Sequence, residues 1–260
     1  MITPPMYPEE RRQRILQLLK EQGRVMVADL SKQFGVSDVT VRGDLQSLAR
    51  QGKLIRTHGG AVPVAAAAVD ELKLESRKRQ HPEEKSAIGA AAAALVEKGD
   101  AIYLDGSSTA LAIARNLKEH QLVTVLTSSL AVAQELMEAP GVTVVLPGGT
   151  VQKDIAALID ADGLHYFDKF NIQKCFFGAH GLALREGLTD ISADVAVVKR
   201  ALISRCRQII AILDASKWGR VGLATFASIA EIDQVITDAD APEALVAHVR
   251  AQGVKVVLVQ

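Results

Sequence analysis

The chain has 260 residues, of which 48% are hydrophobic, a size typical of one large or two ordinary globular domains. The formal net charge is zero, which excludes a uniformly basic or acidic protein. The charge is nevertheless uneven, because residues 1–60 carry ten Lys and Arg against six Asp and Glu, and residues 61–260 carry twenty against twenty-four. A basic head on an acidic body is typical of a protein that binds nucleic acid at one end.

Several functional classes are not expected. No apolar run approaches the ~18 residues that a membrane span needs. Residues 1–8 lack the apolar core of a signal peptide, so we expect a cytoplasmic protein. Cys175 and Cys206 have neither metal-binding nor redox spacing, and we expect reduced thiols. The histidines form no ligand cluster, so we expect no metal and no cofactor.

The first sixty residues predict a helix-turn-helix. Residues 9–22 form an amphipathic pattern that Gly23 ends, and residues 28–34 predict a second, short helix. Gly35 permits a tight turn, and Ser37 stands where the N-cap of a third helix belongs. This order of elements is typical of DNA-binding proteins, although ordinary helical hairpins share it.

The third helix has two different faces. Val41, Leu45 and Leu48 suit a protein core. The rest of its surface offers hydroxyl, guanidinium and amide groups, which read base edges in the DNA major groove. The DNA-contacting residues predicted here are Ser37, Val39, Thr40, Arg42, Gly43 and Gln46.

Residues 53–62 predict a strand, a Gly-Gly turn and a second strand, which is the wing of a winged helix. Lys53, Arg56 and His58 would face DNA phosphates, although a hairpin exposed only to solvent is the alternative. We therefore predict a winged helix-turn-helix domain over residues 1–62. A linker follows over residues 63–82, with a short charged helix that Pro82 ends.

Residues 83–260 alternate helices with short apolar runs. Helices are expected at 85–98, 107–118, 130–138, 193–205 and 242–252. Strands are expected at 101–105, 123–127, 142–146, 175–179, 209–213, 235–237 and 254–259. This alternation predicts an α/β domain with a mostly parallel sheet that is covered on both faces.

Polar and glycine-rich turns follow five of these strands, at the carboxyl ends of the strands, where such sheets bind ligands. Hydroxyls and backbone N–H groups at a helix N-terminus suit an anion, best a phosphate, and a lysine would supply a cation. Each turn alone is more often a simple helix cap. The predicted effector-binding residues are Asp105, Gly106, Ser107, Ser108, Thr109, Ser128, Gly148, Gly149, Gly178, His180, Asp214 and Lys217.

Two sets of stretches resemble the DeoR family of bacterial transcriptional regulators. The N-terminal set is Arg11-x3-Ile15-x3-Leu19, the run from Ser37 to Leu45, and Gly52-x6-Gly59-Gly60-Ala61. The C-terminal set is 104–109, 127–133, 148–150, 187–189, 198–200 and 213–218. The resemblance implies a sensor domain akin to ribose-phosphate isomerases and coenzyme A transferases, with a phosphorylated sugar or related metabolite as effector. It further implies that Ser107, Ser108, Thr109 and Lys217 hold phosphate, with Asp105 and Ser128 as nearby polar ligands.

Four positions depart from the family pattern. Gly43 replaces a larger, often basic residue, so either a phosphate contact is missing or the backbone approaches DNA closely. Gln152 stands where many relatives carry Arg, Asp160 where they carry Gly, and His180 where Asp is common. These three leave the anion-binding turns intact and indicate an atypical effector.

The function expected is a ligand-controlled DNA-binding regulator, a repressor of sugar or polyol genes without enzymatic activity. One winged helix contacts few base pairs, so we expect a homodimer or homotetramer on a double-stranded operator, assembled through the C-terminal domain. One alternative is a sugar-phosphate isomerase with an accessory domain, for which Asp105 or Asp214 would be the general base. The other is a constitutive DNA-binding or scaffold protein whose pocket has degenerated.

Overall fold

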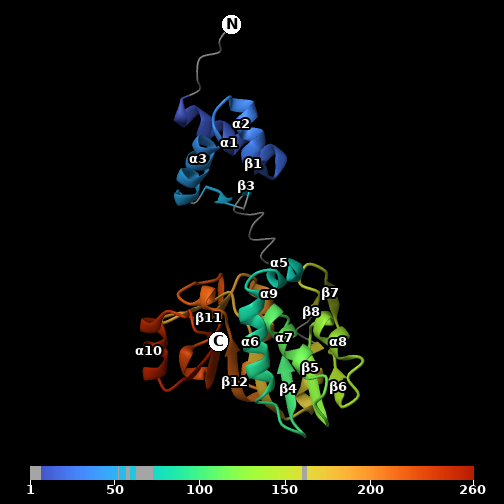
Figure 1. Ribbon diagram of the computed structural model, residues 1–260. Helices are drawn as coiled ribbons and strands as arrows, with labels where there is room; N and C mark the ends of the chain where they lie inside the picture. Colours follow the sequence, from blue (N-terminus) through green and yellow to red (C-terminus); the bar gives the residue numbers. More distant parts are fainter. Residues whose placement is uncertain (1–6, 52, 57–58, 63–72, 160–162) are drawn as a thin grey trace. The chain divides into compact units, whose positions relative to one another are not determined.

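The computed structural model describes residues 7–51, 53–56, 59–62, 73–159 and 163–260. The chain divides into two compact units, Met1–Glu71 and Leu72–Gln260 (Figure 1). The division falls inside the segment 63–82 that the sequence predicts as a linker.

The described residues of the first unit form three helices and a small antiparallel sheet. The helices are α1 (Pro8–Gln22), α2 (Val27–Phe34) and α3 (Asp38–Arg50). The strands are β1 (Val25–Met26), β2 (Ile55–Arg56) and β3 (Gly60–Val62), in the order β1-β3-β2. The predicted helix-turn-helix and wing are therefore confirmed as elements.

Local chemistry explains where α3 begins and which way it faces. The Ser37 hydroxyl accepts a hydrogen bond from the Thr40 amide at 3.2 Å, which is the predicted N-cap. Gly35 ends α2 with φ +62°, a conformation that glycine adopts without strain. Val41, Leu45 and Leu48 are buried in the core of the unit, so the opposite face of α3 is turned to solvent.

The second unit is built on a seven-stranded parallel sheet. Its order is β15-β14-β12-β9-β4-β5-β6. The strands are β4 (Ala101–Leu104), β5 (Val123–Thr127), β6 (Val142–Val145), β9 (Ile172–Phe177), β12 (Cys206–Ile212), β14 (Gln234–Asp238) and β15 (Lys255–Val259). The helices are α5 (Leu74–Lys78), α6 (Pro82–Ala93), α7 (Ser108–Asn116), α8 (Leu130–Leu136), α9 (Ala193–Ile203) and α10 (Glu243–Ala251).

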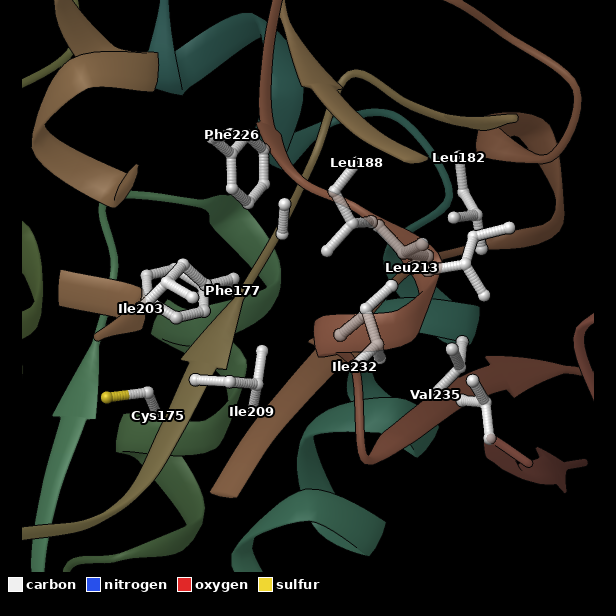
Figure 2. Close-up of a cluster of buried hydrophobic side chains, with 14 of the residues drawn as sticks. Cys175, Phe177, Leu182, Leu188, Ile203, Ile209, Leu213, Phe226, Ile232 and Val235 are labelled. Carbon is white, nitrogen blue, oxygen red and sulfur yellow. The ribbon is translucent and has the colours of Figure 1, made fainter. Parts of the chain in front are cut away.

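Both faces of this sheet are buried, as predicted. Ile102 and Leu104 of β4 join a core with α6, α7 and α8, whereas Tyr103 between them joins a second core on the other face. Figure 2 shows part of this second core, to which the sheet contributes Phe177 and Ile209; the ring centroids of Phe177 and Phe226 lie 6.0 Å apart.

The structure adds strands that the sequence analysis did not predict. β7 (Thr150–Gln152) and β8 (Ala157–Ile159) form a hairpin. β10 (Gly181–Ala183), β11 (Gly187–Asp190) and β13 (Ala224–Ala227) form an antiparallel sheet. Short 3-10 turns lie at Gly163–Lys169, Ala215–Lys217 and Ile229–Glu231. Runs of three or four residues are too short for a periodic pattern to reveal.

Three predictions around the sheet were wrong. Pro82 does not end a helix but begins α6, where its missing N–H costs no hydrogen bond, and α6 ends at Ala93 rather than near Lys98. Cys175 and Cys206 are joined in a disulfide rather than reduced, with Cα atoms 6.0 Å apart. The pairing of β9 with β12 brings the two cysteines together, and a sequence separation of 31 residues could not show it.

Among the described residues, every helix is too short or too polar to cross a membrane.

Candidate DNA-binding surface and effector site

The exposed face of α3 presents the predicted DNA-contacting groups together. Val39 is 78% exposed, and Arg42, Gly43 and Gln46 are exposed as well. The Thr40 hydroxyl lies 2.9 Å from the Ser37 hydroxyl at the start of the helix. This face can therefore meet a nucleic acid without any rearrangement of the core.

The wing is tied to α3 by two of the predicted residues. Arg56 of β2 donates from Nη1 to Oε1 of Gln46 at 3.0 Å. Lys53 is exposed just before β2, and His58 lies outside the described residues. The Arg56–Gln46 contact places a cation next to the amide that was predicted to read bases.

A buried ion cluster fixes α3 on α1, and the sequence analysis assigned it no role. Asp44 is 3% exposed and receives a hydrogen bond from Nε of Arg11 and one of 3.0 Å from Nε of Arg12. A carboxylate next to the buried Leu45, on the core side of a helix, was the signal that could have revealed it.

In the second unit, the turns after β4 and β9 touch each other. Asp105 follows β4, and its Oδ1 accepts from the Ser107 amide while its Oδ2 accepts from the Gly178 amide, both at 2.9 Å. A Cβ added at Gly178 would lie 2.5 Å from Cβ of Ser107, so only glycine allows this approach. The structure thus brings Asp105, Ser107 and Gly178 together at the carboxyl ends of the neighbouring strands β4 and β9.

A buried lysine completes this cluster, although it was not among the predicted site residues. Lys199 of α9 donates to Gly178 O at 2.8 Å and to Oδ2 of Asp190 at 2.9 Å, and it lies 3.1 Å from Oδ2 of Asp105. Burial acts to lower the pKa of Lys199, but the carboxylates of Asp190 and Asp105 outweigh it and the pKa is raised. The same pairing outweighs burial at Asp190 and lowers its pKa. The sequence signal was a lysine that follows Val197 and Val198 on a mostly apolar helix.

A second charged group follows β12. The Asp214 carboxylate accepts from the amide and hydroxyl of Ser216, and its Oδ2 lies 3.9 Å from Nζ of the buried Lys85. Burial lowers the pKa of Lys85 to about 8, Asp214 opposes this, and Lys217 adds to it by repulsion. The predicted residues Asp214 and Lys217 therefore lie beside a second lysine that the prediction omitted.

Arg77 of α5 approaches the first cluster. Its Nη2 donates to Gly106 O at 3.3 Å. Burial lowers the pKa of Arg77, and the carboxylates of Asp105 and Asp190 oppose this shift. Because Arg77 lies in a segment predicted as a linker, nothing in the sequence indicated that it would approach this cluster.

Other predicted residues have different surroundings. Ser108 and Thr109 are buried in the first turn of α7, which the Ser107 hydroxyl caps through the Ala110 amide at 3.1 Å. The Ser128 hydroxyl lies 3.3 Å from the hydroxyl of buried Tyr103.

The remaining turns are more exposed. Gly148 and Gly149 are exposed between β6 and β7, and the His180 ring lies 3.2 Å from Nη2 of Arg220. Of the departing positions, Gln152 lies in β7, whereas Asp160 is outside the described residues.

A cleft of about 680 Å³ lies between α5, α7, α8 and the β7–β8 turn, and none of the predicted effector residues is among its described lining. Lys118 pairs with Glu135 at 2.6 Å and Lys78 with Glu75 at 2.9 Å along this cleft. We favour the strand-end clusters as the ligand site, because their polar groups converge from several strands.

Known proteins resemble the chain along nearly its whole length. The family model of the DeoR-like helix-turn-helix domain matches residues 11–66, and that of the DeoR C terminal sensor domain matches residues 80–239. The HTH-type transcriptional regulator GolR of Listeria innocua is 36% identical, over 90% of this chain and 91% of the relative. The glycerol-3-phosphate regulon repressor of Escherichia coli is 30% identical, over 91% of this chain and 93% of the relative.

Similarity to solved structures is weaker. A ribose 5-phosphate isomerase from Methanocaldococcus jannaschii is 17% identical with a TM-score of 0.41, over 54% of this chain and 55% of that chain. A similarity of this size carries no argument about function.

Proposed function

Because this chain belongs to the DeoR family of transcriptional regulators, we propose that it is a repressor of sugar or polyol metabolism genes whose binding to operator DNA responds to a phosphorylated sugar. The observation that carries the ligand half of this proposal is the convergence of Asp105, Ser107 and Gly178 at the carboxyl ends of β4 and β9. The DNA half rests on the exposed face of α3.

A phosphorylated ligand suits the charges around these turns. The N-terminus of α7 offers partial positive charge, and Lys85, Lys217 and Arg77 surround the neighbouring turns with cations. The name of the glycerol-3-phosphate regulon repressor supports the same ligand class. In this proposal Ser107, Ser108, Thr109 and Lys217 hold the phosphate, and Asp214 is a polar ligand.

The isomerase alternative is less well supported. A general base needs a carboxylate oxygen that can take a proton from the substrate. Asp105 instead accepts amide hydrogen bonds on both oxygens and contacts Lys199. The relatives reported above are named a regulator and a repressor, and the two matching family models describe a helix-turn-helix domain and a sensor domain.

We further propose that the protein acts as a homodimer or homotetramer, because two paired winged helices read two half-sites an integral number of DNA turns apart. Light scattering after gel filtration should give twice or four times the mass of one chain. A monomer at micromolar concentration would contradict this assembly.

Thermal unfolding with hexose, pentose and glycerol phosphates tests the ligand class. A ligand that binds only the native state raises the melting temperature by mass action. Lys217→Ala should remove that rise, whereas a variant at the exposed Lys255 should keep it. Intact operator binding with no rise for any compound would favour the constitutive DNA-binding protein.

A further inference from the structure

Arg77 differs from the lysines around it in its hydrogen bonding. An ammonium has three N–H donors, and those of Lys199 are directed at Gly178 O, Asp190 and Asp105. Lys85 donates to the carbonyl oxygens of Arg77 and Gln80. Nε of Arg77, by contrast, is a buried donor without an acceptor among the described residues.

Such a donor can form a hydrogen bond with an acceptor atom of a ligand. A buried N–H without a partner costs about 1–3 kcal/mol, which an acceptor arriving with the ligand would recover. Lys199 pairs directly with Asp105 and Asp190 in the first cluster, so both carboxylates already have a cation at hydrogen-bond distance. An anion that binds beside this cluster would therefore pair with the Arg77 guanidinium, whose planar arrangement of N–H donors suits phosphate or carboxylate oxygens.

Arg77 also lies on α5, which begins three residues after the last residue of the DNA-binding unit. α5 is the first helix among the described residues of the second unit, and it has five residues. Its contacts include a hydrogen bond from the Leu74 amide to Asp154 O at 3.1 Å, one from Lys85 to Arg77 O at 2.8 Å, and one from Arg77 itself to Gly106 O. A ligand that moves the guanidinium therefore acts on one of the attachments of α5.

We propose that Arg77 senses the anionic group of the effector and couples its binding, through α5, to the DNA-binding unit. This inference rests on the proposed function. It adds Arg77 of α5 to the residues of the strand-end site. It also implies that ligand binding changes which position of α5 is favoured. Arg79, one residue beyond the end of the same helix and exposed, has the same charge outside the cluster and is the matched control.

The test compares wild type with Arg77→Gln, Arg77→Lys and Arg79→Gln. Fluorescence anisotropy on the DNA upstream of the gene gives Kd with and without pooled hexose, pentose and glycerol phosphates. The ratio of the two values should lie in the range of about 5 to 150 for wild type and Arg79→Gln. It should fall below about twofold for Arg77→Gln, and Arg77→Lys should be intermediate because it restores charge without the fork.

Hydrogen exchange supplies a readout that a purely structural role would not change. The pool should alter exchange of the α5 amides in wild type and leave it unaltered in Arg77→Gln. If Arg77→Gln does not fold, a full wild-type ratio in Arg77→Lys overturns the proposal, and a reduced ratio supports it. A full response in Arg77→Gln would overturn the role of Arg77 and leave the proposed function standing. A wild-type protein that binds DNA but ignores the pool would overturn both.

Discussion

Asp44 is the residue on which the orientation of α3 depends most directly. Its two carboxylate oxygens receive hydrogen bonds from separate arginines of α1, and Arg11 is nearly as buried as Asp44 itself. Charges held in this way are stable only while each has its partner. The groups that would touch DNA are therefore positioned by an ion cluster on the opposite side of the helix.

Asp44→Ala should destabilise the DNA-binding unit by about 3 kcal/mol, because it removes a hydrogen-bonded carboxylate from the buried Arg11 guanidinium. Hydrogen exchange of α1 and α3 amides measures the loss locally. Asp29→Ala, an exposed carboxylate on α2, is the control and should change exchange little. Equal protection in the two variants would show that the cluster does not hold the helices together.

Arg42 is exposed on α3, where a base-reading side chain belongs. Arg42→Ala should weaken binding to the operator by about 1–3 kcal/mol while changing binding to a scrambled duplex much less. Anisotropy at one fixed salt concentration compares the two DNAs. An equal loss on both would mean that Arg42 contacts only phosphate.

At the scale of elements, close packing of β1 against β3 defines the base of the wing. Met26 is paired with Gly60, and a Cβ at Gly60 would lie 1.9 Å from Val25 O. Gly60→Ala should therefore destabilise the unit by about 1–3 kcal/mol, since a backbone atom cannot move aside as a side chain can. Exchange of the β1 and β3 amides reports the loss, and unchanged exchange would disprove the close approach.

Gly43 is the contrasting glycine, because nothing lies within 4 Å of a Cβ built there. Gly43→Ala should stabilise α3 by about 1 kcal/mol, measured by the same exchange experiment. Its operator affinity then separates the two interpretations of this position. Unchanged affinity supports a missing phosphate contact, and weakened affinity supports close approach of the backbone to DNA.

Lys85 links α6 to α5 and to the turn after β12, and its charge should make the sensor unit sensitive to pH. Its pKa is about 8 in the fold against 10.5 unperturbed, so between these values the unfolded chain binds more protons than the native chain. The free energy of unfolding should therefore rise with pH over this window. Urea unfolding followed by Trp218 fluorescence from pH 8 to 10 should show a steeper rise in wild type than in Lys85→Gln. Parallel slopes would contradict a depressed pKa.

The sequence was informative where a pattern is long or chemically distinctive. The core face of α3, the Ser37 cap and the alternation behind the parallel sheet could all be predicted, because each follows from periodicity or from a single local hydrogen bond. The partners of Asp44, the Lys199 cluster and the Cys175–Cys206 disulfide could not. They join residues 31 or more positions apart, or lie on helices whose contacts only the fold decides.

At the scale of the whole molecule, the two units have net charges of opposite sign. The basic unit presents one helix face, and the sensor unit gathers buried charges at the carboxyl ends of its parallel strands. Ligand control requires that the ligand bind the DNA-competent and DNA-incompetent states with different affinity. By linkage, operator DNA must then change the affinity for the ligand by the same factor.

The most direct test measures binding of the full chain to the DNA upstream of its gene by fluorescence anisotropy, at fixed salt, with and without pooled sugar phosphates. We expect tight binding whose Kd shifts by about 5- to 150-fold when the pool is added. Tight binding that is indifferent to the pool would contradict ligand control. An absence of binding would contradict the regulator itself.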